Sequence, residues 1–152
     1  MKFVKKVLMG VMCLTIAASM TGFVKANNNK DSAFTVPYSG DGSDVATKAR
    51  AKKDNTYTYV KLNSGAKFQF WAEGKKGIND GDMGNPFSYD YSTPRYTLSA
   101  GKCVYIPNKV RSVKVNGKRL TATYLAISSS DHGKHTYKGV WSPDNLSGFG
   151  EK

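Results

Sequence analysis

The sequence contains few of the residues that cross-link a chain or carry out acid–base and metal chemistry. Its 152 residues include two cysteines, two histidines and two glutamates, Glu73 and Glu151. Cys13 lies in an N-terminal apolar segment, so only Cys103 remains in the rest of the chain and no intramolecular disulfide is expected. With no close pair of glutamates, glycosidase chemistry is not indicated. The GxSxG, SxxK and P-loop motifs are also absent.

No apolar run is long enough for a comfortable membrane span, and the longest one begins close to the N-terminus. Three lysines precede the apolar residues 7–20, and Val24-Lys25-Ala26 follows with small or aliphatic residues at the positions read by signal peptidase. Cys13 lies inside the apolar run without a leucine-led lipobox, which argues against a lipid anchor. We therefore predict a helical signal peptide over 1–26, cleaved after Ala26, and a secreted, extracellular protein.

Acidic residues are scarce relative to basic ones. Four of the 23 basic residues belong to the predicted signal peptide, so 23 − 4 = 19 remain against 11 acidic residues, a formal charge of +8. Such a balance favours an anionic partner, such as a cell-wall polymer or a membrane surface. Nucleic acid is not expected for an exported protein. The alternative is that the lysines only keep a secreted domain soluble.

The clearest local signal is Asn116-Gly117, which lies between two alternating runs within residues 110–127. Asparagine tolerates positive φ and glycine adopts it freely, as a two-residue type I′ turn requires. The register would then place Arg111 opposite Ala122. One face of this hairpin would be dry and the other wet, so we expect it to organise an antiparallel sheet with a single buried face.

Other runs also alternate, and turn residues separate them. Residues 56–62 and 66–72 flank Asn63-Ser64-Gly65 and predict a second hairpin. A third is predicted where 95–100 and 103–106 flank Gly101-Lys102. Further strands are expected at 34–38, as an edge strand cut off by Pro37, and at 135–141, stopped by Pro143. Residues 46–55 show no helical stripe and indicate a basic loop or exposed edge.

About seven short strands and no amphipathic helix predict an all-β fold, either an antiparallel β-sandwich or a partly open barrel. The expected organisation is a flexible mature N-terminus over 27–45, a single β domain over 46–145 and a frayed tail over 146–152. Residues 78–94 form the longest irregular stretch, and a long loop of this kind is typical of a functional or mobile segment.

Several short motifs resemble a group of small secreted proteins of Gram-positive bacteria that is known only as a domain of unknown function. The matching features are Arg50 with Asn55-Thr56, the Phe70-Trp71 step, and the Gly-Val-Trp-Ser-Pro-Asp run at 139–144. The C-terminal part is also similar in style to small secreted β-sandwich bacteriocins. The resemblance implies export and a β fold. It implies no particular activity.

Candidate reactive and metal-binding residues each have an ordinary alternative. His132 and His135 have an H-x-x-H spacing, but no third strong ligand is evident in the sequence. The Asp80-Gly-Asp82 stretch departs from the EF-hand pattern, so a polar turn is the prediction there. Cys103 lies in the run CVYI and is predicted to be a small buried strand residue. We therefore predict no metal site, no cofactor and no catalytic residue.

The aromatic residues near loops and strand ends are the better candidates for a binding site. Flat rings stack on the apolar faces of sugars, and nearby cations attract phosphate or carboxylate groups. The alternative is that the same rings fill the sandwich core. The predicted binding residues are Trp71, Phe87, Tyr89, Tyr91 and Trp141.

These observations predict a secreted, non-enzymatic protein that binds an anionic cell-envelope or extracellular partner. A bacteriocin or toxin-like effector is the alternative. A cysteine-dependent cell-wall enzyme is a third hypothesis, and it depends on Cys103. The ligand and the oligomeric state are not predicted.

Overall fold

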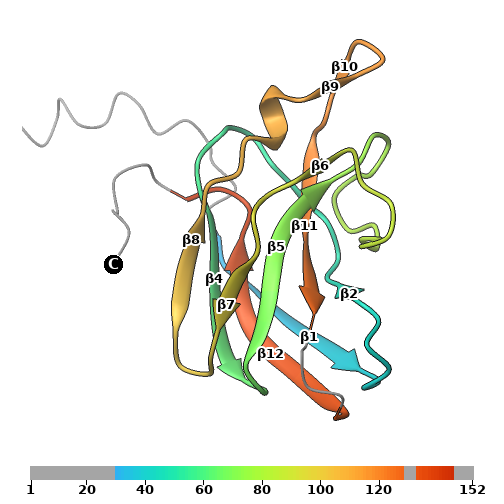
Figure 1. Cartoon of the computed structure of the whole chain (residues 1–152). Helices are drawn as coiled ribbons and strands as arrows, with labels where there is room; N and C mark the ends of the chain where they lie inside the picture. The colour runs from blue at the N-terminus through green and yellow to red at the C-terminus, as the bar shows by residue number, and fades with distance from the viewer. Residues whose placement is uncertain (1–29, 129–132, 146–152) are drawn as a thin grey trace, which may run out of the picture.

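The computed structural model describes residues 30–128 and 133–145. The predicted signal peptide, His132 and the predicted tail after residue 145 lie outside the described residues. The prediction of an all-β fold is confirmed. Two antiparallel sheets face each other as a sandwich that does not close into a barrel (Figure 1).

The first sheet has four strands in the order β1-β12-β4-β8. They are β1 (Ser32–Tyr38), β12 (His135–Ser142), β4 (Thr58–Ser64) and β8 (Cys103–Ile106). The predicted closing strand is confirmed as β12, and β1 is the predicted edge strand. Pro37 lies within β1, where the edge position tolerates a missing N–H. β1 pairs with β12 over seven residues, so residues 32–38 belong to the sheet, and the domain bounds stay a prediction.

The second sheet has the path β2-β11-β5-β6, with β3 added to β11 and β7 added to β5. Its strands are β2 (Val45–Ala46), β3 (Arg50–Ala51), β5 (Phe68–Gly74), β6 (Tyr91–Ser92), β7 (Tyr96–Leu98) and β11 (Ala122–Ser128). The predicted exposed edge at 46–55 is therefore partly correct, since β2 and β3 are short edge strands. Lys52 just after β3 is an exception, because it is buried.

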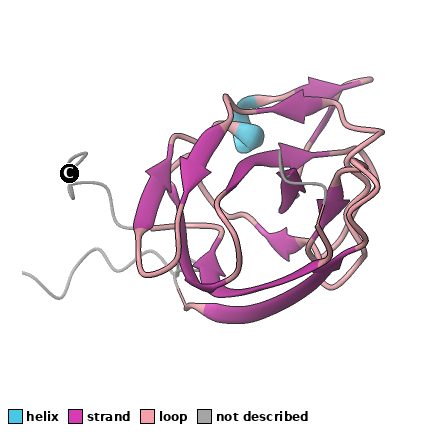
Figure 2. Cartoon of the chain, turned by 60° about the horizontal axis from the view of Figure 1, so that its bottom comes forward, coloured by secondary structure: helices cyan, strands magenta, loops and turns pink. Residues whose placement is uncertain are grey.

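The main core fills the space between the two sheets, with alternate residues of each strand pointing inward. Figure 2 shows the strands of the two sheets on opposite sides of this core. The first sheet contributes Phe34, Val36, Tyr38, Val60, Leu62, Ile106, Tyr137 and Trp141. The second contributes Phe68, Phe70, Ala72, Leu98, Leu125 and Ile127. Burial of these apolar side chains is the main contribution to the stability of the folded state.

The second sheet is buried on both faces, contrary to the prediction of a single dry face. Leu125 and Ile127 of β11 face the main core, whereas Ala122 and Tyr124 form a separate cluster with Ala49 on the outer face. Six consecutive residues of β11 are consequently buried. A strand that is buried on both faces has apolar residues at successive positions, so its sequence shows no polar–apolar alternation.

The Asn116-Gly117 turn is confirmed, but the hairpin around it is much shorter than predicted. Both residues have positive φ, 51° and 78°, and the turn joins β9 (Lys114–Val115) to β10 (Lys118–Arg119). Residues before β9 form the 3-10 helix η2 (Val110–Ser112), so the expected pairing of Arg111 with Ala122 is wrong. Ala122 pairs with Ala51 instead. The hairpin projects from one end of the sandwich and does not organise it (Figure 1).

The other two predicted hairpins are connections between sheets. The turn before β5 carries the chain from β4, in the first sheet, to β5, in the second. The Gly101-Lys102 turn carries it back from β7 to β8 in the same manner. The predicted strands and turns exist, but the predicted pairings are wrong. A turn that connects two sheets contains the same types of residue as a turn that connects two strands of one sheet, so the sequence does not distinguish them.

Over the described residues, no helix has the length and apolar character needed to cross a bilayer.

Candidate functional site

The outer face of β5 carries a buried tryptophan and a buried acid. Phe70 and Ala72 face the main core, so Trp71 and Glu73 point to the opposite side of the sheet. Trp71 Nε1 donates a hydrogen bond to Glu73 Oε1 at 2.5 Å. Only 3% of Trp71 and 0% of Glu73 is exposed, although neither lies in the main core. A separate layer of chain must therefore cover this face.

The loop over residues 75–90 provides that cover. The backbone N–H of Asp90 donates to the last carbonyl of β5 at 2.9 Å. From β11, the Tyr124 hydroxyl donates to Asn85 O at 2.9 Å. Gly84 lies directly against the same ring, because a Cβ at this position would come within 2.4 Å of Tyr124 Cδ2. The longest irregular stretch of the chain is thus packed onto the sheet at several points.

A pocket of about 460 Å³ lies beside this loop, and we call it the aromatic pocket. Its volume lies within the range of small-molecule sites in proteins. Two prolines and two hydroxyl side chains complete the lining. The side chains that carry rings or charge are Trp71, Phe87, Tyr89, Asp44, Glu73 and Arg95. Apolar rings and hydrogen-bonding groups of both charges therefore meet in one place.

Glu73 is the most unusual of the pocket residues. Its Oε1 accepts the hydrogen bond from Trp71, whereas its buried Oε2 has no hydrogen-bond partner. Burial raises the pKa of Glu73 to about 7, although the hydrogen bond from Trp71 opposes this effect. Near neutral pH the carboxyl group can therefore either donate or accept a hydrogen bond. An unsatisfied polar atom beside a cavity is typical of a binding site.

Arg95 supplies the positive charge of the aromatic pocket. Its guanidinium lies 4.0 Å from the centroid of the Trp71 ring, in a cation–π contact. It also lies 3.7 Å from the carboxylate of Asp44, and 53% of its side chain is exposed. Cations were expected near the rings. No lysine lines this pocket, and Arg95 is the cation beside the rings.

Three of the five predicted binding residues come together in the aromatic pocket. They are Trp71, Phe87 and Tyr89. The two rings from the loop are open to solvent, with Phe87 71% and Tyr89 52% exposed. Trp71 is covered by Arg95 and is not itself displayed. The predicted stacking surface is therefore made by the loop, above a tryptophan that packs against it.

The other two predicted residues lie elsewhere. The hydroxyl group of Tyr91, in β6, accepts a hydrogen bond from the backbone N–H of Lys109 at 2.8 Å. This contact ties the loop after β5 to the segment before η2. Trp141 belongs to β12 and is only 2% exposed. Its ring packs in the main core.

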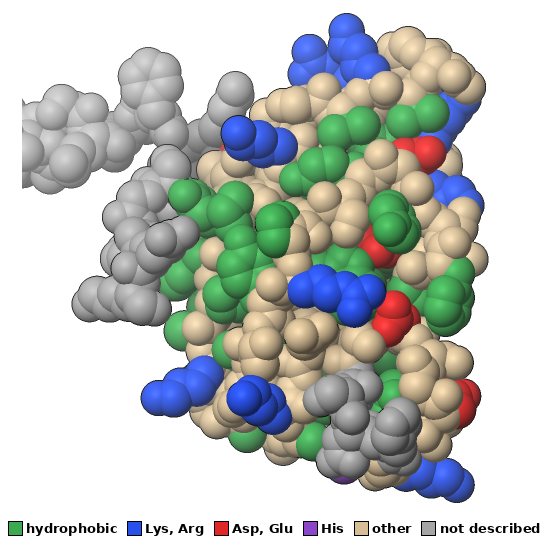
Figure 3. All heavy atoms as spheres, viewed as in Figure 1, with side chains coloured by type: hydrophobic (Ala, Val, Ile, Leu, Met, Phe, Trp, Pro, Cys, Tyr) green, Lys and Arg blue, Asp and Glu red, His purple; other side chains and the backbone are tan. Residues whose placement is uncertain are grey.

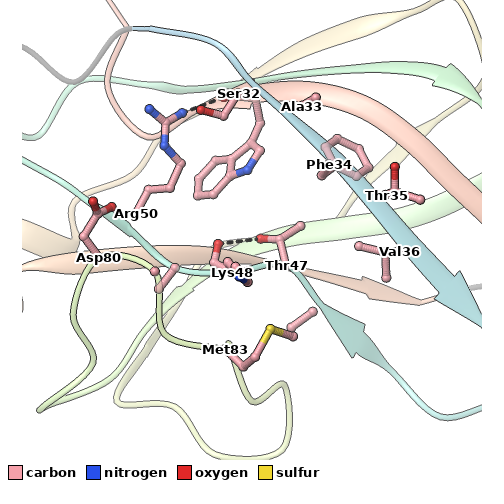
Figure 4. A pocket seen from close by; sticks show the side chains of 14 residues that line it. Ser32, Ala33, Phe34, Thr35, Val36, Thr47, Lys48, Arg50, Asp80 and Met83 are labelled. Atoms are coloured by element: carbon pink, nitrogen blue, oxygen red, sulfur yellow. Dashed lines mark hydrogen bonds between the residues drawn. The ribbon is translucent and has the colours of Figure 1, made fainter.

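Trp141 also lines a second cavity of about 420 Å³, which we call the edge groove (Figure 4). The groove lies between edge strand β1 and the β2–β3 segment. Arg50 and Asp80 lie together at one end, and Val36 lies at the other. Arg50 donates a hydrogen bond to Trp141 O at 2.8 Å, which holds the guanidinium against the wall of the groove.

Asp44, Glu73 and Arg95 line the pocket but were not among the predicted binding residues. For Glu73 a signal exists, since it interrupts the apolar run FQFWAEG at a strand position where a charge is rarely buried without a reason. Asp44 and Arg95 have no comparable signal. They come near β5 only through the pairing of distant strands.

The residues considered for metal or cysteine chemistry have other roles or settings. Asp80 and Asp82 accept backbone N–H groups, from Ala51 and Asn79. Among residues 30–128 and 133–145, no group of three potential ligands could hold a metal ion. Cys103 is exposed on edge strand β8, so the prediction that it is buried is wrong. Strand β4 separates β8 from β12, which carries His135.

The β9–β10 hairpin and the residues just before it form a basic surface. Figure 3 shows basic side chains at the end of the molecule where this hairpin projects. Residues 102–128 contain no acidic residue. The exposed cations are Lys109, Lys114, Lys118 and Arg119. Such a surface attracts polyanions, and salt screens the attraction.

The comparisons with known proteins give a family but no activity. The family model described as "Protein of unknown function (DUF2712)" matches residues 22–145, which is most of the chain. No curated protein and no solved structure matches the chain. The match agrees with the resemblance to a domain of unknown function that the sequence analysis drew from short motifs.

Proposed function

The chain belongs to the DUF2712 family of proteins of unknown function, and from this premise we propose that it is a secreted, non-enzymatic binding protein for an anionic glycan of the cell envelope. The observation that carries the proposal is the aromatic pocket. It combines two exposed rings, Phe87 and Tyr89, with the guanidinium of Arg95 and the unsatisfied oxygen of Glu73.

Each part of the pocket fits one feature of such a ligand. The exposed rings stack on the apolar face of a sugar. Arg95 binds a carboxylate or phosphate group, since its planar fork matches these anions. Glu73 lies beneath the rings and holds the Trp71 indole in place through the hydrogen bond at Oε1. The basic β9–β10 hairpin contributes long-range attraction that speeds the encounter with a polyanion.

Retention of the purified protein on isolated peptidoglycan with attached teichoic acid tests this function. We expect binding that weakens as salt is raised. Phe87→Ala and Tyr89→Ala should each weaken binding about threefold to tenfold, since a ring contact contributes about 0.5–1.5 kcal/mol. Met83→Ala is the matched control, because Met83 is an equally open apolar residue of the same loop that lines the edge groove. Equal losses in Phe87→Ala and Met83→Ala would overturn the proposal, as would no retention of the wild type.

Replacement of the hairpin lysines distinguishes long-range electrostatic attraction of the ligand from its contacts with the aromatic pocket. Lys114→Gln combined with Lys118→Gln should reduce the salt dependence of binding. Phe87→Ala should leave that dependence unchanged and lower the affinity at every salt concentration. A wild-type affinity that does not vary with salt would contradict an anionic ligand.

A second candidate function rests on the large apolar side chains exposed on the same loop. Met83, Phe87 and Tyr89 are each more than half exposed, and exposed apolar groups beside basic ones can enter a membrane surface. This fits a bacteriocin-like effector. Growth inhibition of related strains by the purified protein, lost on substitution of all three residues, would favour this function over glycan binding.

A further inference from the structure

A lysine and an aspartate that are 92 residues apart in the sequence meet in a closed site at one end of the sandwich. Lys52 Nζ lies 2.9 Å from Asp144 Oδ1, and 0% of either side chain is exposed. Lys52 follows β3, and Asp144 follows β12. The site therefore joins a segment of the second sheet to the last described strand of the first.

The lysine nitrogen is held in place by the backbone as well. It donates hydrogen bonds to the carbonyl oxygens of Thr56, at 2.7 Å, and of Pro143. These contacts fix the position of Nζ beside the carboxyl group. Holding Nζ in one orientation beside the carboxyl group lowers the entropy cost of a reaction between the two.

The carboxyl group of Asp144 is polarised from its other side. The backbone N–H of Lys53 donates to Asp144 Oδ2 at 2.9 Å. If Nζ attacks Cγ, negative charge develops on this oxygen, and an N–H group already points at it. A backbone donor so placed stabilises the tetrahedral intermediate of acyl transfer.

A second carboxyl group lies next to the pair. Asp54 interacts both with the Asp144 side chain and with the charge of Lys52. Its Oδ1 is held by the backbone N–H of Thr56, at 2.9 Å, and by the Thr56 hydroxyl, at 2.5 Å. Although burial raises the pKa of Asp54, the hydrogen bonds from Thr56 and the neighbouring Asp144 and Lys52 lower it overall, so this group is an ionised carboxylate that can accept a proton from the amine and pass it on.

Burial changes the protonation state that the pair favours. An ion pair removed from water loses much of its hydration energy. The same burial lowers the pKa of Lys52, although the charge of Asp144 opposes this shift. The neutral amine is the nucleophilic form of lysine, and burial of Nζ favours it.

We propose that Lys52 and Asp144 join in an intramolecular isopeptide bond. The lone pair of Nζ attacks Cγ of Asp144 and forms a C–N bond, while Asp54 accepts a proton from the nitrogen. Asp54 then protonates the Asp144 oxygen that leaves, the C–O bond breaks, and one water molecule is released. No oxidation or external reagent is involved, since the products are one amide and one water.

The bond would close a covalent loop from residue 52 to residue 144, which includes most of the two sheets. In a chain without a cysteine pair after the predicted signal peptide, this cross-link does what a disulfide does elsewhere: it restricts the unfolded state. It is independent of the proposed binding function, because none of its three residues lines the aromatic pocket.

Intact mass spectrometry of the purified protein tests the proposal. We expect a mass lower than that of the linear chain by one water molecule, and a tryptic cross-linked species that contains both Lys52 and Asp144. A succinimide at Asp144 would give the same mass but unlinked peptides, and this result would overturn the proposal. A full mass with unlinked peptides would do so as well.

Two variants and a control assign the chemistry. Lys52→Arg keeps the positive charge but cannot form the amide, so its full mass should be retained. Asp54→Asn should slow cross-linking and leave a full-mass population that decreases with time. Lys53→Arg, at the neighbouring exposed lysine, should lose one water as the wild type does. The masses are measured on denatured protein. A full mass in Lys52→Arg could result from misfolding, and Asp54→Asn addresses this alternative because it keeps both Lys52 and Asp144. A water loss that persists in Lys52→Arg would contradict the assignment.

Discussion

Asp144 and Glu73 are both buried carboxyl groups, at 0% exposure, but their surroundings differ in kind. Asp144 has a donor on each oxygen: Lys52 Nζ on Oδ1 and the backbone N–H of Lys53 on Oδ2. Glu73 has Trp71 on Oε1 and no hydrogen-bond partner on Oε2. One acid is enclosed between two segments of backbone, whereas the other borders an open pocket.

The difference shows how burial alone fails to identify a functional group. A buried charge with full hydrogen bonding fixes the arrangement of the chain segments around it. A buried acid with one free oxygen costs stability, and such a cost is typical of a position where a ligand completes the bonding. We therefore assign Asp144 to the architecture of the fold and Glu73 to the binding site.

The largest expected effect distinguishes the Lys52–Asp144 pair from the ion pair at the aromatic pocket. Lys52→Met should lower the free energy of unfolding by about 3–5 kcal/mol, because it prevents the proposed cross-link and leaves the Asp144 carboxyl group buried without its partner. Arg95→Met removes the exposed pair with Asp44 and should cost about 1 kcal/mol or less. Urea titration of both variants measures the difference. Equal losses would remove the distinction between the two regions.

The next effect tests whether the loop after β5 is a packed layer. Gly84→Ala places a Cβ against the Tyr124 ring and should lower the free energy of unfolding by about 1–3 kcal/mol. Weaker glycan retention should accompany this loss, since the loop carries Phe87 and Tyr89. Chemical denaturation together with the retention assay measures both changes. A neutral Gly84→Ala would show that the loop does not depend on its contact with Tyr124.

The third prediction concerns pH. The pKa of Glu73 is raised from 4.5 to about 7, so the folded protein holds this proton more tightly than the unfolded chain. The stabilisation is complete below pH 4.5 and is lost as pH rises through 7, which amounts to about 3 kcal/mol. Glu73→Gln should flatten unfolding midpoints measured between pH 5 and 8. A wild-type profile that rises over this range would contradict the assignment.

The smallest effect on stability is expected where the effect on binding is large. Phe87 is 71% exposed, so Phe87→Ala should change the free energy of unfolding by less than about 0.5 kcal/mol. Phe70→Ala in the main core provides the contrast, at a cost of about 3–5 kcal/mol. Thermal and urea unfolding give both values. A large loss in Phe87→Ala would mean that the ring supports the fold and is not displayed for a ligand.

Much of the local structure can be predicted from the sequence. Strands β4, β5, β8 and β12 lie close to the predicted runs, and the Asn116-Gly117 turn has the expected positive φ values. Alternation and turn chemistry are local properties, so a single sequence carries them. The pairings are not local. The segments on either side of Gly101-Lys102 alternate as a hairpin would, yet β7 pairs with β5 and β8 with β4.

The candidate site was only partly predictable for the same reason. Phe87 and Tyr89 stand out as aromatic residues in a long irregular stretch, and the structure places both at the aromatic pocket. Arg95 and Asp44 come together only through the pairing of distant strands. Lys52 is indistinguishable in the sequence from its exposed neighbour Lys53, and tertiary contacts alone make it the buried one.

An all-β chain of short alternating strands, with one tight turn and an excess of positive charge, follows from the amino-acid sequence alone. Those properties arise from side-chain period and backbone preference, which act over a few residues. Tertiary contacts set which strands pair, which face of the second sheet is covered, and which carboxyl groups among residues 30–128 and 133–145 become fully buried, namely Glu73 and Asp144. Contacts between residues far apart in the sequence determine these features, and no local pattern encodes them.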